Sequence, residues 1–341
     1  MQKPLSLLTA SALLMAGPAF AQVQGLAAPE EVRAKALAKD ERPDGWNFKL
    51  KLGITGSFLQ SDAVVGQEPG VTLQLGTIIE AGADLKSGPH GWENALTFRL
   101  GFTKTPQIRP VVKSLDDLVF QSTYTFNFDD PDWLGPFVRF RLNTSMLPGY
   151  VVRATDVNVR RIPTEGDPTT EPLTSNSRLS LNGAFEPLVL RQSVGAFANP
   201  IESEALVLKA KLGLGAQQVI GRNGFVLADV PTTPELEILQ VRNAVDLGAE
   251  AEVAMTGVIV KDALNWKLSA NAFQPFTTPA AATAKGLTGI ELMNVEVNGG
   301  LSLKVNKSIG IEYVLLLRRQ PLVIDALQIQ NGLLLSAAWD F

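Results

Sequence analysis

The sequence predicts an all-β fold: one antiparallel transmembrane β-barrel of about 12 strands, with 14 as the alternative count. Three observations predict it. Apolar and polar residues alternate with a period of two over most of the chain, most alternating segments run about 11–17 residues, and short and long connections follow one another in turn. Strands of soluble proteins average about 5–6 residues, whereas a tilted strand that crosses a bilayer needs about 9–11. The strands of a soluble β-sandwich also alternate apolar and polar residues. The strand lengths and the connection pattern therefore favour the membrane barrel over the sandwich.

The composition excludes several classes of function. The 341 residues carry a net charge of −4, which gives no basic surface for nucleic acid. The chain has no cysteine, so disulfides, thiolate metal sites and thiol nucleophiles are excluded. One histidine rules out a multi-histidine metal site. No cofactor or resident metal is expected.

Residues 1–21 are predicted to be a secretory signal peptide. Lys3 supplies the positive start, an apolar stretch of about 11 residues follows, and Ala19-Phe-Ala21 is a cleavage motif, with cleavage after Ala21. A transmembrane anchor is the alternative, but a helix needs about 20 apolar residues to cross a bilayer. Residues 22–45 then form a periplasmic segment, possibly with a short helix from Pro29. This segment is a flexible lead, a lumen plug or a periplasmic contact, and residues 46–341 form the barrel.

The first predicted strand shows the alternation. Trp46, Phe48 and Leu50 are apolar, whereas Lys49 and Lys51 between them are charged. Successive side chains of a strand point to opposite faces, so this strand has one apolar and one polar face. The predicted strands are residues 46–58, 71–86, 92–104, 117–128, 136–146, 178–198, 205–217, 244–260, 264–274, 289–305, 309–319 and 325–341.

The connections between these strands alternate in length. With the mature N-terminus in the periplasm, tight turns follow the even-numbered strands, and most odd-numbered strands lead into long polar loops, notably 147–177 and 218–243. Short periplasmic turns and long extracellular loops are typical of transmembrane barrels. In residues 178–198 the apolar parity changes after Glu186-Pro187. A bulge in one strand explains this change and keeps the alternation, whereas a hairpin would raise the count to 13 or 14.

The last strand ends on Trp339 and Phe341, preceded by apolar residues of the same parity. In this ending, and in the signal peptide and alternation, the chain resembles bacterial outer-membrane β-barrel proteins. The resemblance implies an outer-membrane location and recognition of Trp339 and Phe341 by the barrel-assembly machinery. Three shorter segments also resemble landmarks of an uncharacterised barrel family, a domain of unknown function, which implies no activity. They are Trp92-Glu-Asn94, Lys113-Ser-Leu-Asp-Asp117 and Pro148-Gly-Tyr150.

The polar parity would face the lumen and carry the candidate functional residues. Charged residues that face a cavity within a membrane mark ion or substrate paths. The predicted pairs between neighbouring strands are Lys49 and Lys51 with Glu80 and Asp84, and Lys209 and Lys211 with Glu250 and Glu252. A basic strip of Arg139, Arg141, Arg178 and Arg191 has only Glu186 as a carboxylate on its own strands. Two interpretations stay open: a packed salt-bridge lattice, and a hydrated path biased toward anions.

Catalysis is disfavoured because the only histidine, His90, lies in a turn on the periplasmic side. A nucleophile at the outer leaflet would need its base at the opposite end of the barrel. The acidic residues of the long loops, Glu165, Asp167 and Glu171, are better explained as solvated charges. Asp129, Asp130 and Asp132 offer oxygen ligands for calcium but are also ordinary turn residues.

The leading functional prediction is a passive channel for small polar or anionic solutes. The alternatives are a sealed structural or surface-interaction barrel that acts through the two long loops, and, disfavoured, an outer-membrane enzyme. The expected partners are outer-membrane lipids, the barrel-assembly machinery and small solutes, without nucleic acid.

Overall fold

The computed structural model describes residues 44–61, 69–203, 205–227, 233–261, 263–277, 288–306, 309–321 and 324–340. Twelve long strands within these ranges form one wall. They are β1 (Gly45–Ser61), β2 (Gly70–Ser87), β3 (His90–Lys104), β4 (Val112–Phe126), β5 (Leu134–Thr144), β10 (Leu188–Glu202), β11 (Leu206–Ile220), β14 (Ala244–Val260), β15 (Leu264–Pro275), β16 (Asn294–Lys304), β17 (Ile309–Gln320) and β18 (Ile324–Asp340).

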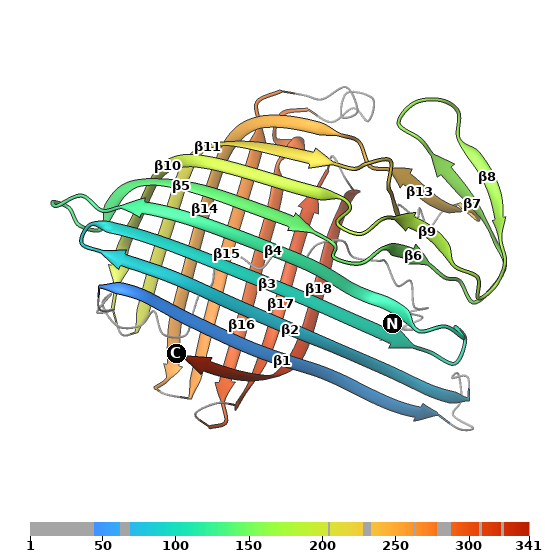
Figure 1. Ribbon diagram of the computed structural model, residues 1–341, viewed down its shortest axis with the longest axis horizontal. Coiled ribbons are helices and arrows are strands. Elements are labelled where there is room, and N and C mark those ends of the chain that lie inside the picture. Colours follow the sequence, from blue (N-terminus) through green and yellow to red (C-terminus); the bar gives the residue numbers. More distant parts are fainter. Residues whose placement is uncertain are drawn as a thin grey trace, which may run out of the picture.

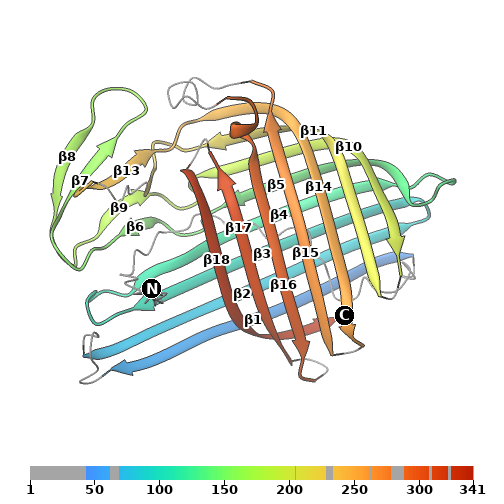
Figure 2. The same ribbon diagram turned by 180° about the vertical axis from the view of Figure 1, so that it is seen from behind.

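These strands close into a barrel in which every neighbour is antiparallel. The order around the wall is β1-β18-β17-β16-β15-β14-β11-β10-β5-β4-β3-β2, and β1 closes the ring by pairing with β18. Figure 1 shows the first strands crossing in front of the last strands, and Figure 2, seen from behind, shows the last strands in front. The predicted fold class is confirmed. Leu50 pairs in register with Trp339, and Phe341 lies outside the described residues.

The connections at the two ends of the barrel differ in length, which confirms the predicted alternation. At one end only residues 88–89, 127–133, 203–205, 261–263 and 305–308 join consecutive wall strands. At the other end, residues 145–187 join β5 to β10 and residues 221–243 join β11 to β14. Residues 1–43, with the predicted signal peptide and most of the predicted periplasmic segment, lie outside the described ranges.

The two faces of the wall differ as the alternation predicts. Large apolar side chains cover the outside, and Ile54 and Leu212 are 70% and 66% exposed. The inside holds charged and polar side chains, and Asp117 and Arg139 are 0% and 2% exposed. An apolar exterior around a polar interior is the inverse of a soluble protein and is stable only in contact with lipid. The chain is a β-barrel of the outer-membrane type.

The predicted bulged strand at residues 178–198 is wrong. Its second half is β10, but its first half forms β9 (Leu179–Asn182), which pairs with β6 (Gly149–Val151) outside the barrel wall. Leu181 is buried in a separate apolar core, which explains why the apolar parity changes within the segment. A period of two fits a short loop strand as well as a wall strand, so the pattern alone could not separate them.

The predicted strand at residues 289–305 starts too early. Gly289–Leu292 is instead a short 3-10 helix, η1, and β16 begins at Asn294. Thr288 and Glu291 form a capping box at its start, which explains the helical turn. Within the described ranges, no helix is long and apolar enough to cross a membrane.

The two longest connections fold together into a small β unit, here called the loop domain, which the sequence did not predict. Its main sheet has the order β12 (Phe225–Leu227), β13 (Leu236–Gln240), β7 (Val157–Ile162) and β8 (Thr169–Leu173). β13 and β7 are parallel, so one connection pairs directly with the other. The loop domain lies beyond the long-connection end of the barrel (Figure 1). Its buried core residues are Val151, Val159, Leu173, Leu181, Leu236 and Ile238.

Substitution of Ile238 by aspartate is expected to unfold the loop domain and leave the barrel intact. Ile238 is fully buried in the loop-domain core, and burial of an unpaired carboxylate there costs several kcal/mol. Limited proteolysis of refolded protein should then cut within residues 145–187 while the barrel stays resistant. Val245→Asp, on the exposed outer wall, is the control and should leave the loop domain uncut. If the loops of Ile238→Asp resist the protease as well as those of wild type, the loop domain has no core of its own.

A buried ion pair fastens the loop domain to the barrel. Lys113 Nζ lies 2.6 Å from Asp116 Oδ2 at the long-connection end of β4, and both residues are buried. Asp116 accepts hydrogen bonds from the backbone N–H groups of Met146 and Leu147, at 2.9 and 2.8 Å, and Lys113 donates to the Leu147 carbonyl at 2.8 Å. The first residues after β5 are therefore held against β4.

Candidate functional site

The barrel interior holds the candidate site, and its largest cluster joins strands that are not adjacent in the wall. Arg139 on β5 lies 2.8 Å from Glu250 Oε1 and 2.5 Å from Glu252 Oε2, both on β14. β10 and β11 lie between these strands, so the pairs cross the interior. We call Arg139, Glu250, Glu252 and Arg191 the central lattice. Arg139, Glu250 and Glu252 are buried, and buried charges are tolerated only when they are paired and hydrogen-bonded.

Neighbouring polar groups complete the central lattice. Arg191 on β10 lies 3.3 Å from Glu250, and it donates to Asn271 Oδ1 at 3.1 Å and to Gln217 Oε1 at 2.5 Å. Asn271 in turn donates to Glu250 at 3.0 Å. Such a network fixes each side chain in one position, because a change of rotamer would leave a buried charge unpaired.

A second cluster crosses the interior between β5 and the far wall. Arg141 Nη2 lies 3.5 Å from Glu296 Oε1 on β16, and Arg318 on β17 lies 2.7 Å from Glu296 Oε2. Four strands separate β16 from β5 along the wall. Glu296 therefore joins two arginines from opposite sides, and the ion pairs divide the lumen.

A third cluster lies against one side of the wall and is more open to solvent. Lys51 on β1 lies 3.4 Å from Glu80 on β2 and 2.5 Å from Glu312 on β17. The side chains of Lys51, Glu80 and Glu312 are 22%, 17% and 13% exposed, against 2% and 3% for Arg139 and Glu250. We call Lys51, Glu80 and Glu312 the open wall.

Aromatic rings fill the interior beside the central lattice. Phe137, Phe197 and Phe273 face inward and are buried, and the Arg191 guanidinium lies 4.9 Å from the centre of the Phe273 ring. Gly248 makes room for this ring, since a Cβ at that position would lie 2.8 Å from Phe273 Cζ. Buried rings therefore fill the interior beside β5, β10, β14 and β15.

The structure brings several predicted residues together. Lys49 lies 3.3 Å from Asp84, Lys51 lies beside Glu80, and Lys211 lies 3.7 Å from Glu252. Glu250 contacts Arg139 and Arg191. Lys209 shares the inward face with Lys211, closer to the short-connection end.

The predicted basic strip needs two corrections. Arg178 is not on the wall: it lies just before β9, exposed, with its guanidinium 4.8 Å from the centre of the Tyr150 ring. The other three arginines have glutamate partners from distant strands. Comparison of adjacent strands alone misses these partners, because barrel closure decides which strands face one another.

His90 lies at the short-connection end of β3, where Nδ1 is 2.6 Å from the Tyr124 hydroxyl. Both side chains are exposed on the aromatic rim formed with Phe126 and Trp92. Aromatic residues at this depth are typical of barrel interfaces. Within the described ranges, no group of three or more histidine and acidic residues could hold a metal ion.

Comparisons with known proteins give one partial family match. Residues 67–150 match a family described as "Protein of unknown function (DUF3078)". This span contains all three predicted landmarks, so the resemblance to a barrel family of unknown function is confirmed. It runs from just before β2 into β6 and includes Lys113 and Asp116, which fasten the loop domain. No curated protein matches the chain.

Solved structures with distant likeness are outer-membrane proteins. The COG4313 outer membrane channel from Pseudomonas putida F1 is 9% identical, with a TM-score of 0.40 over 92% of this chain and 100% of that chain. The toluene transporter TodX of P. putida is 12% identical, with a TM-score of 0.36 over 90% and 94%. The translocator domain of the autotransporter NalP from Neisseria meningitidis is 8% identical, with a TM-score of 0.38 over 89% and 90%. The barrel assignment rests on the strand pairing of the chain itself.

Proposed function

We propose that the protein is a bacterial outer-membrane barrel that gives small polar or anionic solutes a narrow passive path. The location is inferred from the predicted signal peptide, cleaved after Ala21, and from the apolar outer wall. Recognition of Trp339 and Phe341 by the barrel-assembly machinery is part of this proposal. We propose no catalytic role, because the lone histidine lies at the short-connection end, away from an outer-leaflet substrate.

The uneven exposure of the interior carries the proposal. Charged side chains at the open wall keep contact with solvent, whereas Arg139, Glu250 and Glu252 of the central lattice are closed off. Solutes would therefore pass beside Lys51, Glu80 and Glu312. Because Arg139, Arg141 and Arg191 are paired with glutamates, any preference for anions would be weak, and size and polarity would dominate selection.

A sealed barrel that acts through its loop domain is the second candidate. The near-complete burial of Arg139 and Glu250 favours it, since ion pairs that cross the interior also block it. The ordered loop domain would then be the functional surface. A single assay separates the two candidates.

Liposome swelling with refolded full-length protein tests the proposal. We expect swelling in small sugars and amino acids that slows steeply as solute size increases, because the open wall leaves only a narrow path. Heat-denatured protein in the same lipids is the control. Liposomes that stay impermeable to the smallest solutes would overturn the channel and favour the sealed barrel.

A further inference from the structure

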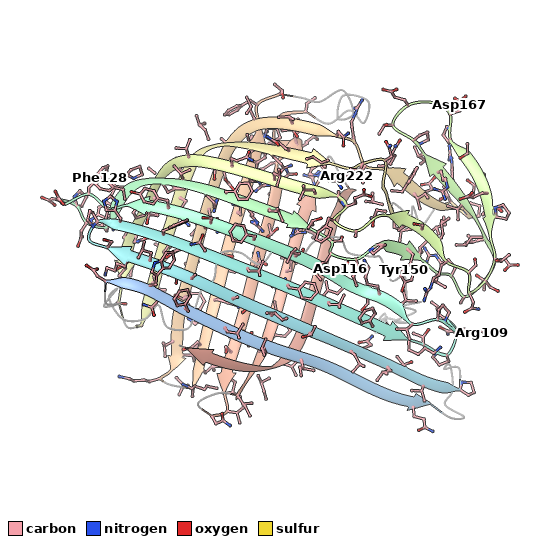
Figure 3. All side chains as sticks on the ribbon, viewed as in Figure 1. Arg109, Asp116, Phe128, Tyr150, Asp167 and Arg222 are labelled. Atoms are coloured by element: carbon pink, nitrogen blue, oxygen red, sulfur yellow. The ribbon has the colours of Figure 1, made fainter. Side chains whose placement is uncertain are left out.

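Three segments meet beside β3 and β4 at the long-connection end of the barrel. The backbone N–H of Arg109, in the β3–β4 connection, donates to Asn176 Oδ1 at 2.6 Å. The Asn176 N–H donates to the Arg153 carbonyl at 2.8 Å. The Tyr150 hydroxyl donates to the Val111 carbonyl at 3.2 Å. The loop domain is thus joined to the rim of the barrel. Figure 3 labels Arg109 and Tyr150 at this end, in the right half of the view.

Cationic side chains gather at this junction. Lys104 donates to the Arg109 carbonyl, Arg178 lies over the Tyr150 ring, and the side chains of Arg109 and Arg178 are exposed. Within the described part of the chain, no carboxylate lies within ion-pair distance of Lys104, Arg109 or Arg178. Asp156, also near this junction, accepts a hydrogen bond from the Ser175 N–H at 2.7 Å.

Other arginines of the loop domain differ from these. Arg160 lies 3.4 Å from Glu237, and Arg161 lies 2.6 Å from Glu171. A paired arginine has little affinity left for an external anion. Lys104, Arg109 and Arg178 therefore form a basic patch that can accept an anionic partner, and guanidinium groups bind phosphate oxygens in bidentate geometry.

A pocket of about 240 Å³ lies at this rim, and its lining includes Thr103 and Lys113, both buried. Thr103 alternates with Phe102 and Lys104 along β3, so it points to the opposite face of the strand from Lys104. Phe102 and Lys104 share the outer face of β3, Phe102 is 36% exposed, and Lys104 is nearer the long-connection end. The exposed apolar wall and the basic patch thus follow one another in the order of the acyl chains and the headgroups of a lipid leaflet.

We propose that the basic patch binds the phosphorylated headgroup of an outer-leaflet lipid. Lys104, Arg109 and Arg178 contact the phosphate, and the outer wall at Phe102 contacts the acyl chain. This inference rests on the membrane orientation of the proposed function, with the long connections outside, but not on an open lumen.

Titration of refolded full-length protein with lipid A tests this site. Bisphosphorylated lipid A and its dephosphorylated form are added to wild type, to the double variant Arg109→Gln/Arg178→Gln, and to Arg222→Gln/Arg242→Gln. The last variant is the matched control, because it removes two exposed arginines from the other long connection. We expect wild type and control to prefer the phosphorylated lipid at least about tenfold, and the double variant to lose that preference.

Three outcomes would overturn the site: no preference for the phosphorylated lipid in wild type, an unchanged preference in the double variant, or full displacement of lipid A by inorganic phosphate. Displacement would assign the patch to a free anion. Arg178→Gln alone, an exposed side chain, keeps the test valid if the double variant fails to refold. Swelling measured on the same preparations separates failure of this site from failure of the channel.

Discussion

Replacement of Arg139 by methionine is expected to lower the free energy of unfolding of the barrel by about 3 kcal/mol. Breaking a buried ion pair by removal of one partner typically costs about 3–5 kcal/mol, since the remaining charge stays buried. The lower end of this range applies because each glutamate still has a cationic partner: Arg191 for Glu250 and Lys211 for Glu252. Urea unfolding of the refolded barrel in lipid vesicles measures the change.

Lys51→Met is the matched control for this prediction. It also removes one lumen cation with two carboxylate partners, but its side chain is partly exposed, so water can replace the partner. We expect Lys51→Met to lower the free energy of unfolding clearly less than Arg139→Met does. Addition of Glu252→Gln to Arg139→Met should restore part of the lost free energy. Equal losses for the two single variants would show that the central lattice is no tighter than the open wall.

Removal of one ion pair from the central lattice is expected to enlarge the conducting path. Arg139→Ser with Glu252→Ser leaves the net charge unchanged and clears two side chains that meet across the interior at 2.5 Å. Planar-bilayer recording should show clearly larger conductance steps than wild type. Arg160→Ser with Glu237→Ser removes an ion pair of the loop domain and should leave the conductance unchanged. Unchanged steps in the lattice variant would place the constriction elsewhere.

Much of the barrel wall could be predicted from the sequence. The predicted strand at residues 244–260 has the same bounds as β14, and its less buried and more buried residues alternate from Val245 to Val253. The alternation is a reliable signal because one face of each strand contacts lipid and must be apolar, whereas the other face contacts a polar lumen. Where a loop strand has its own apolar core, as at Leu181, the same period appears for another reason and the prediction fails.

Contacts across the lumen could not be predicted. Lys51 and Glu80 lie on adjacent strands, so hairpin register alone brings them together. Arg141 and Glu296 meet only because the barrel closes with a particular tilt and shear, which the sequence does not express. The loop domain was missed for a similar reason, since its parallel pairing joins two connections far apart in the chain.

The charge selectivity of a variant in which both open-wall glutamates are neutralised tests the central claim most directly. The claim is that solutes pass beside Lys51, Glu80 and Glu312. Glu80→Gln with Glu312→Gln leaves Lys51 without its two carboxylate partners, so the reversal potential in a salt gradient should shift toward that of the anion. Glu171→Gln with Glu237→Gln removes the same charge from the loop domain and should cause no shift. An unchanged reversal potential in the open-wall variant, or the absence of conductance in wild type, would contradict the claim.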